Sequence, residues 1–115
     1  MRRKNFKLSA EEIMPLAEGF GACIASDKIL VDGFRIAFMY REPPDNDVDS
    51  GWRFLSGQES DEYMDNAGNH GVYDVNTLAN YDPEIIPFLE SPEGAAFERE
   101  NGTGPFVKVD FQPPR

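Results

Sequence analysis

The chain of 115 residues is 40% hydrophobic and 12% aromatic, a composition that is typical of one folded domain and excludes disorder over most of its length. Its 21 acidic and 11 basic residues give a net charge of −10, so the body of the domain should repel nucleic acid, whose phosphates are contacted by Lys and Arg. A single cysteine excludes an internal disulfide, and no apolar run is long enough to cross a membrane, so we expect a cytoplasmic protein without membrane contacts.

The beginning of the chain differs in charge from the rest. Residues 1–7 hold four of the basic residues and no acid, and we expect them to form a flexible basic tail. The remainder carries 7 basic and 21 acidic residues, a net charge of −14. This body should attract basic proteins and speed their encounter, although the same charge can serve solubility alone. A single globular domain is expected over residues 8–111, followed by a short flexible tail over residues 112–115.

A short helix should open the domain. Ser9 and Glu12 have the spacing of a capping box, in which the serine caps the first turn and the glutamate reaches back to the backbone of the serine. Pro15 lacks the N–H group that would continue the hydrogen-bond ladder. We therefore expect this helix to end soon after it begins.

A block of short strands should follow the helix. Residues 22–25 and 28–31 are apolar runs, and residues 34–41 alternate between apolar and polar side chains. Asp32-Gly33 is typical of a two-residue hairpin turn, because glycine accepts the positive φ of that turn. The predicted buried face of the third strand carries Phe34, Ile36, Phe38 and Tyr40.

The second half of the domain should alternate between loops, short helices and strands. Residues 42–50 contain two prolines and three aspartates and are expected to form a loop. Asp82 should cap a short helix, with Pro83 at its first position, where the missing N–H is tolerated. The other expected elements are a strand over 52–55, an acidic helical turn over 59–65, a loop over 66–71, a helix over 76–81, and strands over 95–98 and 106–111.

Together these elements predict an α+β domain that is rich in β-strand. Short strands enclose a core only if the sheet curves strongly or is covered by a second layer. We therefore expect a single small domain with a curved antiparallel sheet, or a small open barrel, and two or three short helices.

The acidic stretch after the alternating strand raises the question of a metal site. Asp45, Asp47 and Asp49 are spaced like the first oxygen ligands of a calcium loop. However, Ser50 and Ser56 stand where an EF-hand loop needs glycine and glutamate. We interpret this stretch as a solvated acidic loop and predict no metal site, although weak adventitious binding of a divalent ion stays open.

No catalytic residue can be assigned. Cys23 and His70 are the only residues of their kinds, and a Cys–His pair can act as a nucleophile and its base. Cys23, however, lies in an expected core strand, and His70 lies in an expected loop. The carboxylates of residues 59–65 stand among polar neighbours and lack the burial that would separate their pKa values for acid–base work. We predict no enzymatic activity and no cofactor.

The candidate functional residues are therefore those of a protein-binding surface. Arg41, Trp52 and Arg53 are of the types that anchor interfaces. Alternatively, Trp52 belongs to the core and both arginines pair with the neighbouring aspartates. The acidic candidates are Glu42, Asp45, Asp47, Asp49, Glu59, Asp61 and Glu62. This set predicts a basic protein as the partner, bound by a monomer or a homodimer.

A set of short motifs is spread over most of the domain. They are Met39-Tyr40-Arg41-Glu42, Asp49-Ser50-Gly51-Trp52-Arg53-Phe54, Ser56-Gly57, Glu62-Tyr63-Met64, Asn76-Thr77 and Asn80-Tyr81-Asp82-Pro83. Over about residues 21–106 the chain resembles a bacterial family that is grouped with the predicted immunity proteins of polymorphic toxin systems. The stretch that begins at Asp49 is the most specific part of this resemblance.

The resemblance implies a fold and a role. The fold would be a compact β-rich domain, similar to the inserted domain of some bacterial transcription antitermination factors. The role would be the neutralisation of a toxin by binding, without catalytic residues. A regulatory or transcription-linked module is the alternative, and it follows from fold similarity alone.

Overall fold

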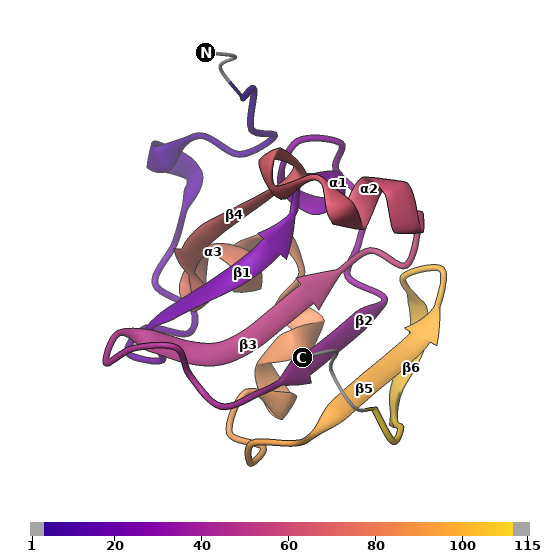
Figure 1. Cartoon of the computed structure of the whole chain (residues 1–115). Helices are drawn as coiled ribbons and strands as arrows, with labels where there is room; N and C mark the ends of the chain where they lie inside the picture. Colours follow the sequence, from indigo (N-terminus) through magenta and orange to yellow (C-terminus); the bar gives the residue numbers. More distant parts are fainter. Residues whose placement is uncertain (1–3, 112–115) are drawn as a thin grey trace.

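One sheet organises the fold in the computed structural model, which describes residues 4–111 (Figure 1). Its six strands are β1 (Ala22–Ser26), β2 (Phe38–Arg41), β3 (Asp49–Leu55), β4 (His70–Asp74), β5 (Ala96–Glu100) and β6 (Thr103–Lys108). They lie in the order β4-β1-β3-β2-β5-β6, and within the described residues β4 and β6 do not pair with each other. The sheet is therefore open, and the predicted α+β, β-rich class is confirmed.

The sheet is mixed because one of its neighbouring pairs is parallel. β1 and β3 run in the same direction, whereas the other neighbouring strands are antiparallel. A parallel pair needs a crossover connection. Here the chain between the two strands passes through a short helix and through β2 before it returns to lie beside β1. The expectation of a curved antiparallel sheet thus holds for every neighbouring pair except this one.

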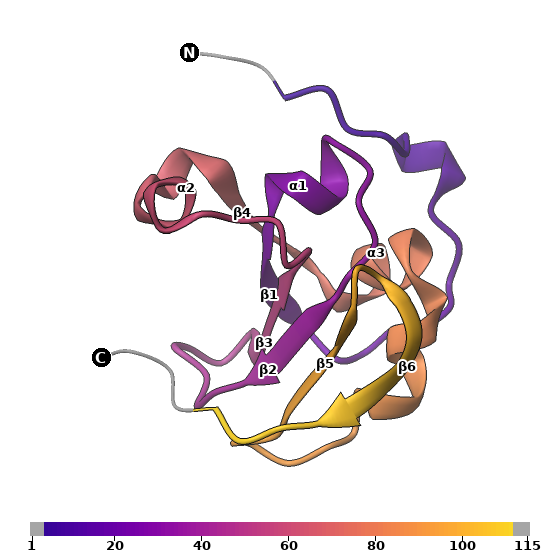
Figure 2. The same cartoon turned by 90° about the vertical axis from the view of Figure 1, so that its right-hand side faces the viewer.

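Short helical segments complete the described part of the chain. They are η1 (Ala10–Glu12), α1 (Asp27–Leu30), α2 (Asp61–Asp65), η2 (Ala67–Asn69), α3 (Val75–Tyr81) and η3 (Pro83–Phe88), where η denotes a 3₁₀ turn. Figure 2 shows α3 on one side of the sheet and α2 projecting on the other. Among these described helices, none has the length and apolar character needed to cross a membrane.

The core lies between one face of the sheet and the segment from α3 through η3. Its large buried side chains include Met39, Trp52 and Phe54 from the sheet and Leu78, Ile85 and Leu89 from the helical side. The Trp52 ring is 0% exposed, and its Nε1 donates a hydrogen bond to the carbonyl oxygen of Leu89 at 3.1 Å. A buried indole needs such a partner, so the core alternative for Trp52 is the one that the structure shows.

The opposite face of the sheet, which we call the open face, carries Tyr40, Arg53 and Leu55. These side chains point away from the core because neighbours along a strand alternate between the two faces. α2 and η2 stand over one end of the open face. At the other end the ring of Phe111 packs against Phe38 and Tyr40, with centroid distances of 4.9 and 4.7 Å. Helices therefore cover one face of the sheet and only flank the other.

Residues 28–31 lie in a helix and its end, not in the predicted strand. The Oγ of Ser26 accepts a hydrogen bond from the backbone of the first turn of α1. Ile29 and Leu30 are both buried, which a half-buried strand does not allow for adjacent residues. The predicted hairpin turn is wrong as well, because Gly33, with φ of +84°, lies in the turn that follows α1 and donates its N–H to the carbonyl oxygen of Ile29 at 3.1 Å.

The strand predicted over residues 34–41 is shorter and presents its other face to the core. β2 begins at Phe38, and Phe34 is exposed in the segment before it. Within β2, Met39 is the fully buried side chain, whereas Phe38 and Tyr40 lie on the open face. Of the predicted buried face, Ile36 is fully buried as expected, whereas the prediction is wrong for Phe34, Phe38 and Tyr40, because the alternation does not run unbroken from the segment before β2 into β2.

The other elements lie near their predicted positions. Ser9 and Glu12 form the predicted capping box at η1, and Asp82 caps η3. The predicted acidic turn, the helix after it and the strands near the chain end overlap α2, α3, β5 and β6. The loop predicted over residues 66–71 is wrong at its end, because β4 begins at His70 and pairs with β1.

Part of the predicted basic tail contacts the domain. Within residues 4–7, the Nζ of Lys4 forms an ion pair with Asp27 at 2.9 Å. The N–H of Lys7 donates a hydrogen bond to the carbonyl oxygen of Leu30, the last residue of α1. Residues 1–3 and 112–115, on which the remaining tail predictions fall, lie outside the described residues.

Candidate protein-binding site

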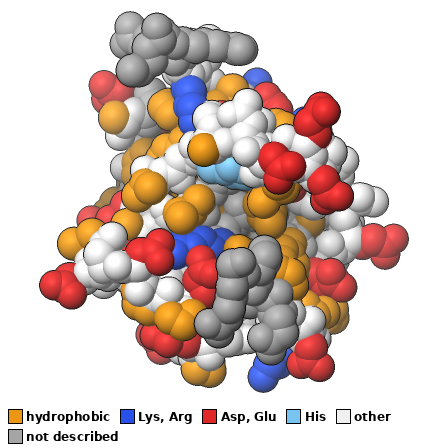
Figure 3. Space-filling model, viewed as in Figure 1, with side chains coloured by type: hydrophobic (Ala, Val, Ile, Leu, Met, Phe, Trp, Pro, Cys, Tyr) orange, Lys and Arg blue, Asp and Glu red, His pale blue; other side chains and the backbone are white. Residues whose placement is uncertain are grey.

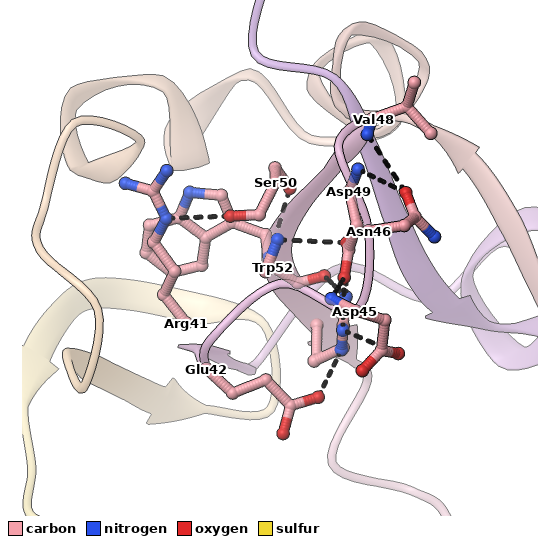
Figure 4. A network of polar contacts seen from close by, with 10 residues as sticks. Arg41, Glu42, Asp45, Asn46, Val48, Asp49, Ser50 and Trp52 are labelled. Atoms are coloured by element: carbon pink, nitrogen blue, oxygen red, sulfur yellow. Dashed lines mark hydrogen bonds and ion pairs between the residues drawn. The ribbon is translucent and has the colours of Figure 1, made fainter.

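Arg53 gathers several of the candidate residues into one network. Its Nε donates to Glu42 at 2.6 Å, and its Nη2 donates to Asp49 at 2.8 Å. Asp45 lies 3.7 Å from the same guanidinium group. Figure 4 shows these carboxylates converging from β3 and from the loop before it. Arg53 is 4% exposed, so its charge is satisfied internally, as the pairing alternative predicts, and it does not project as an anchor.

The loop that carries the aspartates is closed by its own side chains. The Oδ1 of Asn46 accepts hydrogen bonds from the N–H groups of Val48 and Asp49, both at 3.0 Å. Asp49 accepts from the N–H groups of Asp45 at 2.8 Å and Gly51 at 3.0 Å. Alternating Asp and Asn thus build turns, which explains the likeness to a calcium loop. Among the described residues, no three or more His, Cys, Asp or Glu side chains are arranged to hold a metal ion.

The network is fixed in its charged form. The hydrogen bonds from Arg53 hold the pKa of Asp49 well below its ordinary value of 3.8. Burial works against the charge of Arg53, but its hydrogen bonds with Asp49 and Glu42 outweigh burial and raise its pKa. Asp49 therefore stays ionised at neutral pH and holds no proton to donate. This arrangement suits electrostatic organisation and not acid–base chemistry.

Gly51 lets β3 pass close to the chain that leaves β2. Its φ is +89°, and a Cβ atom there would clash with the carbonyl oxygen of Glu42. The N–H of Glu42 in turn donates to the carbonyl oxygen of Gly51 at 3.0 Å. The pairing of β1 with β3 shifts register at this point, as at a bulge. The glycine therefore positions the carboxylate of Glu42 beside Arg53.

Replacing Gly51 with alanine should be far more harmful than replacing Gly94. Both glycines have positive φ, of +89° and +94°, but a Cβ on Gly94 would meet nothing within 4 Å. We expect Gly51→Ala to lower the free energy of unfolding by about 2 kcal/mol or more beyond Gly94→Ala, since overpacking adds to backbone strain. Urea unfolding of both variants checks this, and equal losses would contradict the close approach at Gly51.

Arg41 and Trp52 lie on the covered side of the sheet, away from the Arg53 network. The Arg41 guanidinium lies 5.8 Å from the centroid of the Trp52 ring. It donates to the carbonyl oxygens of Ser50 at 2.9 Å and Ser91 at 2.8 Å. Arg41 therefore joins β3 to the turn before β5, and it does not pair with the aspartates as its alternative predicts. In the free protein both residues support the fold.

The remaining acidic candidates divide into inward and outward groups. Glu59 turns inward, because its carboxylate accepts from the N–H and Oγ of Ser56 and from the N–H of Gly57. The outward carboxylates lie at two places, in the loop before β3 and on α2. Figure 3 shows acidic side chains on both sides of a hollow in the open face. The outward group consists of Asp45, Asp47, Asp61 and Glu62, together with Asp65, which was not among the candidates.

The structure separates Cys23 from His70. Cys23 is fully buried on the covered face, and burial strongly raises the pKa of its thiol. His70 begins β4 and borders the open face. A reactive cysteine needs a stabilised thiolate, and Cys23 has the opposite surroundings. These two residues therefore do not form the nucleophile–base pair considered above.

Comparison with known protein families gives a match over most of the chain. The family model of the immunity protein Imm33 domain matches residues 23–110. No curated protein and no solved structure shows a match to this chain. The matched span runs from the second residue of β1 to beyond the end of β6, and it includes the Arg53 network and the outward carboxylates. It confirms the grouping that the sequence motifs predict, and the chain belongs to the Imm33 family of immunity proteins.

Proposed function

We propose that this protein neutralises a toxin by binding it through the outward carboxylates that flank the open face. The proposal rests on the family and on one observation, the outward carboxylates of the β2–β3 loop and α2. Within residues 4–111, Asp47, Asp61, Glu62 and Asp65 form no ion pair. Their charge is therefore available to a basic partner.

Three arginines of the described part already pair with carboxylates of the same chain. Arg53 and Arg99 are buried in ion pairs, and Arg35 pairs with Asp82 and Glu84. Arg53 and Arg99 are thus held inside the fold, while the carboxylates of Asp47, Asp61, Glu62 and Asp65 remain exposed. A field of this kind accelerates the capture of a basic protein and weakens as salt screens it. Neutralisation by binding requires no catalytic group in this chain, because covering the active surface of the toxin is sufficient.

Co-expression tests the proposal. Each protein encoded next to this gene would be produced in a bacterial host with and without the chain, and growth would be followed to find a toxin. We expect the chain to restore growth, and we expect the purified pair to associate more slowly in high salt. A second immunity protein of similar net charge serves as the control, because it shows whether negative charge alone is enough to bind the toxin and restore growth. Failure both to restore growth and to bind would contradict the proposal.

The regulatory or transcription-linked alternative stays a prediction from the resemblance. None of the contacts or charges of the described residues favours it over toxin binding. The partner's basic character, the monomer or homodimer state and the cytoplasmic location also remain predictions.

A further inference from the structure

A hollow of about 360 Å³ opens on the open face. Ile24, Tyr40 and Leu55 line it from β1, β2 and β3, and Met64 and Ala67 line it from α2 and η2. Figure 3 shows this depression below the single histidine side chain, with acidic groups to either side. Its lining is mainly apolar, and Met64 is 39% exposed at its edge. An apolar hollow of this size accepts one or two side chains of a partner.

His70 supplies a polar group that has no partner. Its Nε2 is buried, and no donor or acceptor within the described residues hydrogen-bonds to it. The residue lines the same hollow. Buried polar atoms are nearly always hydrogen-bonded in folded proteins, and leaving one without a partner is unfavourable. This atom therefore marks a position where a polar group from outside would be stabilised once the side chains that cover the nitrogen move aside on binding.

The charges around the hollow favour a basic occupant. Glu42 and Asp65 are among its lining residues, and further outward carboxylates lie beyond each. Arg53 is the cation at the floor, but Glu42 and Asp49 already satisfy it. Lys or Arg on the occupant would find carboxylates on both sides, whereas an acidic occupant would be repelled.

We infer that the hollow receives an apolar side chain from a basic segment of the toxin. Lys or Arg residues that flank this side chain reach the carboxylates on the two sides, and a polar group of the segment hydrogen-bonds to the Nε2 of His70. This inference rests on the proposed function and adds to it the place of docking and the chemistry of the docked segment.

Two exposed methionines provide a matched test. Met64 lies at the hollow, whereas Met14, 58% exposed, is held by Asn80 of α3 on the covered side of the sheet. The dissociation constant for the toxin would be measured for Met64→Lys and Met14→Lys. We expect Met64→Lys to weaken binding at least about tenfold, since it places a like charge against a basic segment, and Met14→Lys to change it less than about twofold.

His70→Phe tests the polar contact separately. This variant removes the unsatisfied nitrogen and keeps an aromatic ring, so the free protein should unfold at the same or a higher urea concentration. Binding to the toxin should nevertheless weaken about fivefold or more. Unchanged binding by His70→Phe would remove His70 from the site even if the methionine result holds.

The outcomes separate the two proposals. If the wild-type chain neutralises the toxin and Met64→Lys binds as tightly as Met14→Lys, docking at the hollow is wrong and the proposed function stands. If the wild-type chain does not bind the toxin, both proposals fail. If the free chain self-associates and Met64→Lys makes it monomeric without weakening toxin binding, the face belongs to a second copy and the inference is overturned.

Discussion

Asp82→Ala should lower the free energy of unfolding by about 3–5 kcal/mol, because it removes one partner from a buried ion pair. The Asp82 side chain is 0% exposed and pairs with Arg99, whose side chain is 1% exposed. It also pairs with Arg35 at 2.9 Å and accepts the N–H of Ile36 at 3.0 Å. This carboxylate therefore ties η3 to β5 and to the segment that precedes β2.

The cost of this substitution arises from the groups that it leaves behind. Arg99 would keep only Glu84 as a carboxylate partner, and the buried N–H of Ile36 would lose its acceptor. A buried charge without its ion-pair partner and a buried N–H without an acceptor both lower the stability of the fold. Because folded domains are stable by only about 5–15 kcal/mol, this single change should remove a large part of the total stability.

Urea unfolding followed by circular dichroism measures the effect, with Glu84→Ala as the control. Glu84 contacts the same two arginines, but its side chain is 61% exposed. Its removal should therefore cost no more than about 1 kcal/mol. Equal losses for the two variants would show that burial of Asp82 does not carry the stabilisation assigned to it.

Arg53→Met should lower the free energy of unfolding by about 2–3 kcal/mol, somewhat less than the loss of a fully buried partner. Asp49 would lose the bidentate contact that offsets its partial burial. Glu42 and Asp45 are more exposed and can be rehydrated. Lys108→Met, an exposed substitution with the same loss of charge, should change stability by less than about 0.5 kcal/mol. Similar values for both variants would contradict a structural role for the network.

The same variant should change the dependence of stability on pH. The pKa of Asp49 is lower in the folded protein than its ordinary value of 3.8. Its contribution to stability is therefore fully present above that value and is lost as the pH falls below it towards the folded pKa. In Arg53→Met the pKa of Asp49 in the folded protein should return towards the ordinary value. The part of the stability that Asp49 loses at low pH should then no longer be seen. Urea unfolding between about pH 6 and pH 3 checks the difference in slope.

Local sequence signals predicted much of the fold. The capping box at Ser9 and the cap at Asp82 depend on residues next to each other in the chain. The strand around Trp52 is similarly marked by its own composition. The apolar run at Ile29 was misassigned because a short apolar run fits a buried helix as well as a strand. The serine before it and Gly33 after it are the signals that favour a helix.

The candidate site was predictable only in part. Pairing between Arg53 and the neighbouring aspartates follows from their closeness in the sequence. By contrast, the hollow combines side chains from distant segments, and neither Met64 nor His70 carries a local signal for it. The Asp82–Arg99 pair also joins elements far apart in the chain. Such contacts depend on the sheet order β4-β1-β3-β2-β5-β6, which no local pattern reveals.

Docking on the open face is tested most directly by a methyl NMR titration of the chain with its toxin. Ile24, Leu55 and Met64 carry methyl groups at the hollow, whereas Met14 and Leu16 contact α3 on the covered side. We predict that the methyl signals of Ile24, Leu55 and Met64 shift on binding and that those of Met14 and Leu16 do not. Shifts confined to Met14 and Leu16 would place the toxin on the other side of the molecule and contradict docking on the open face.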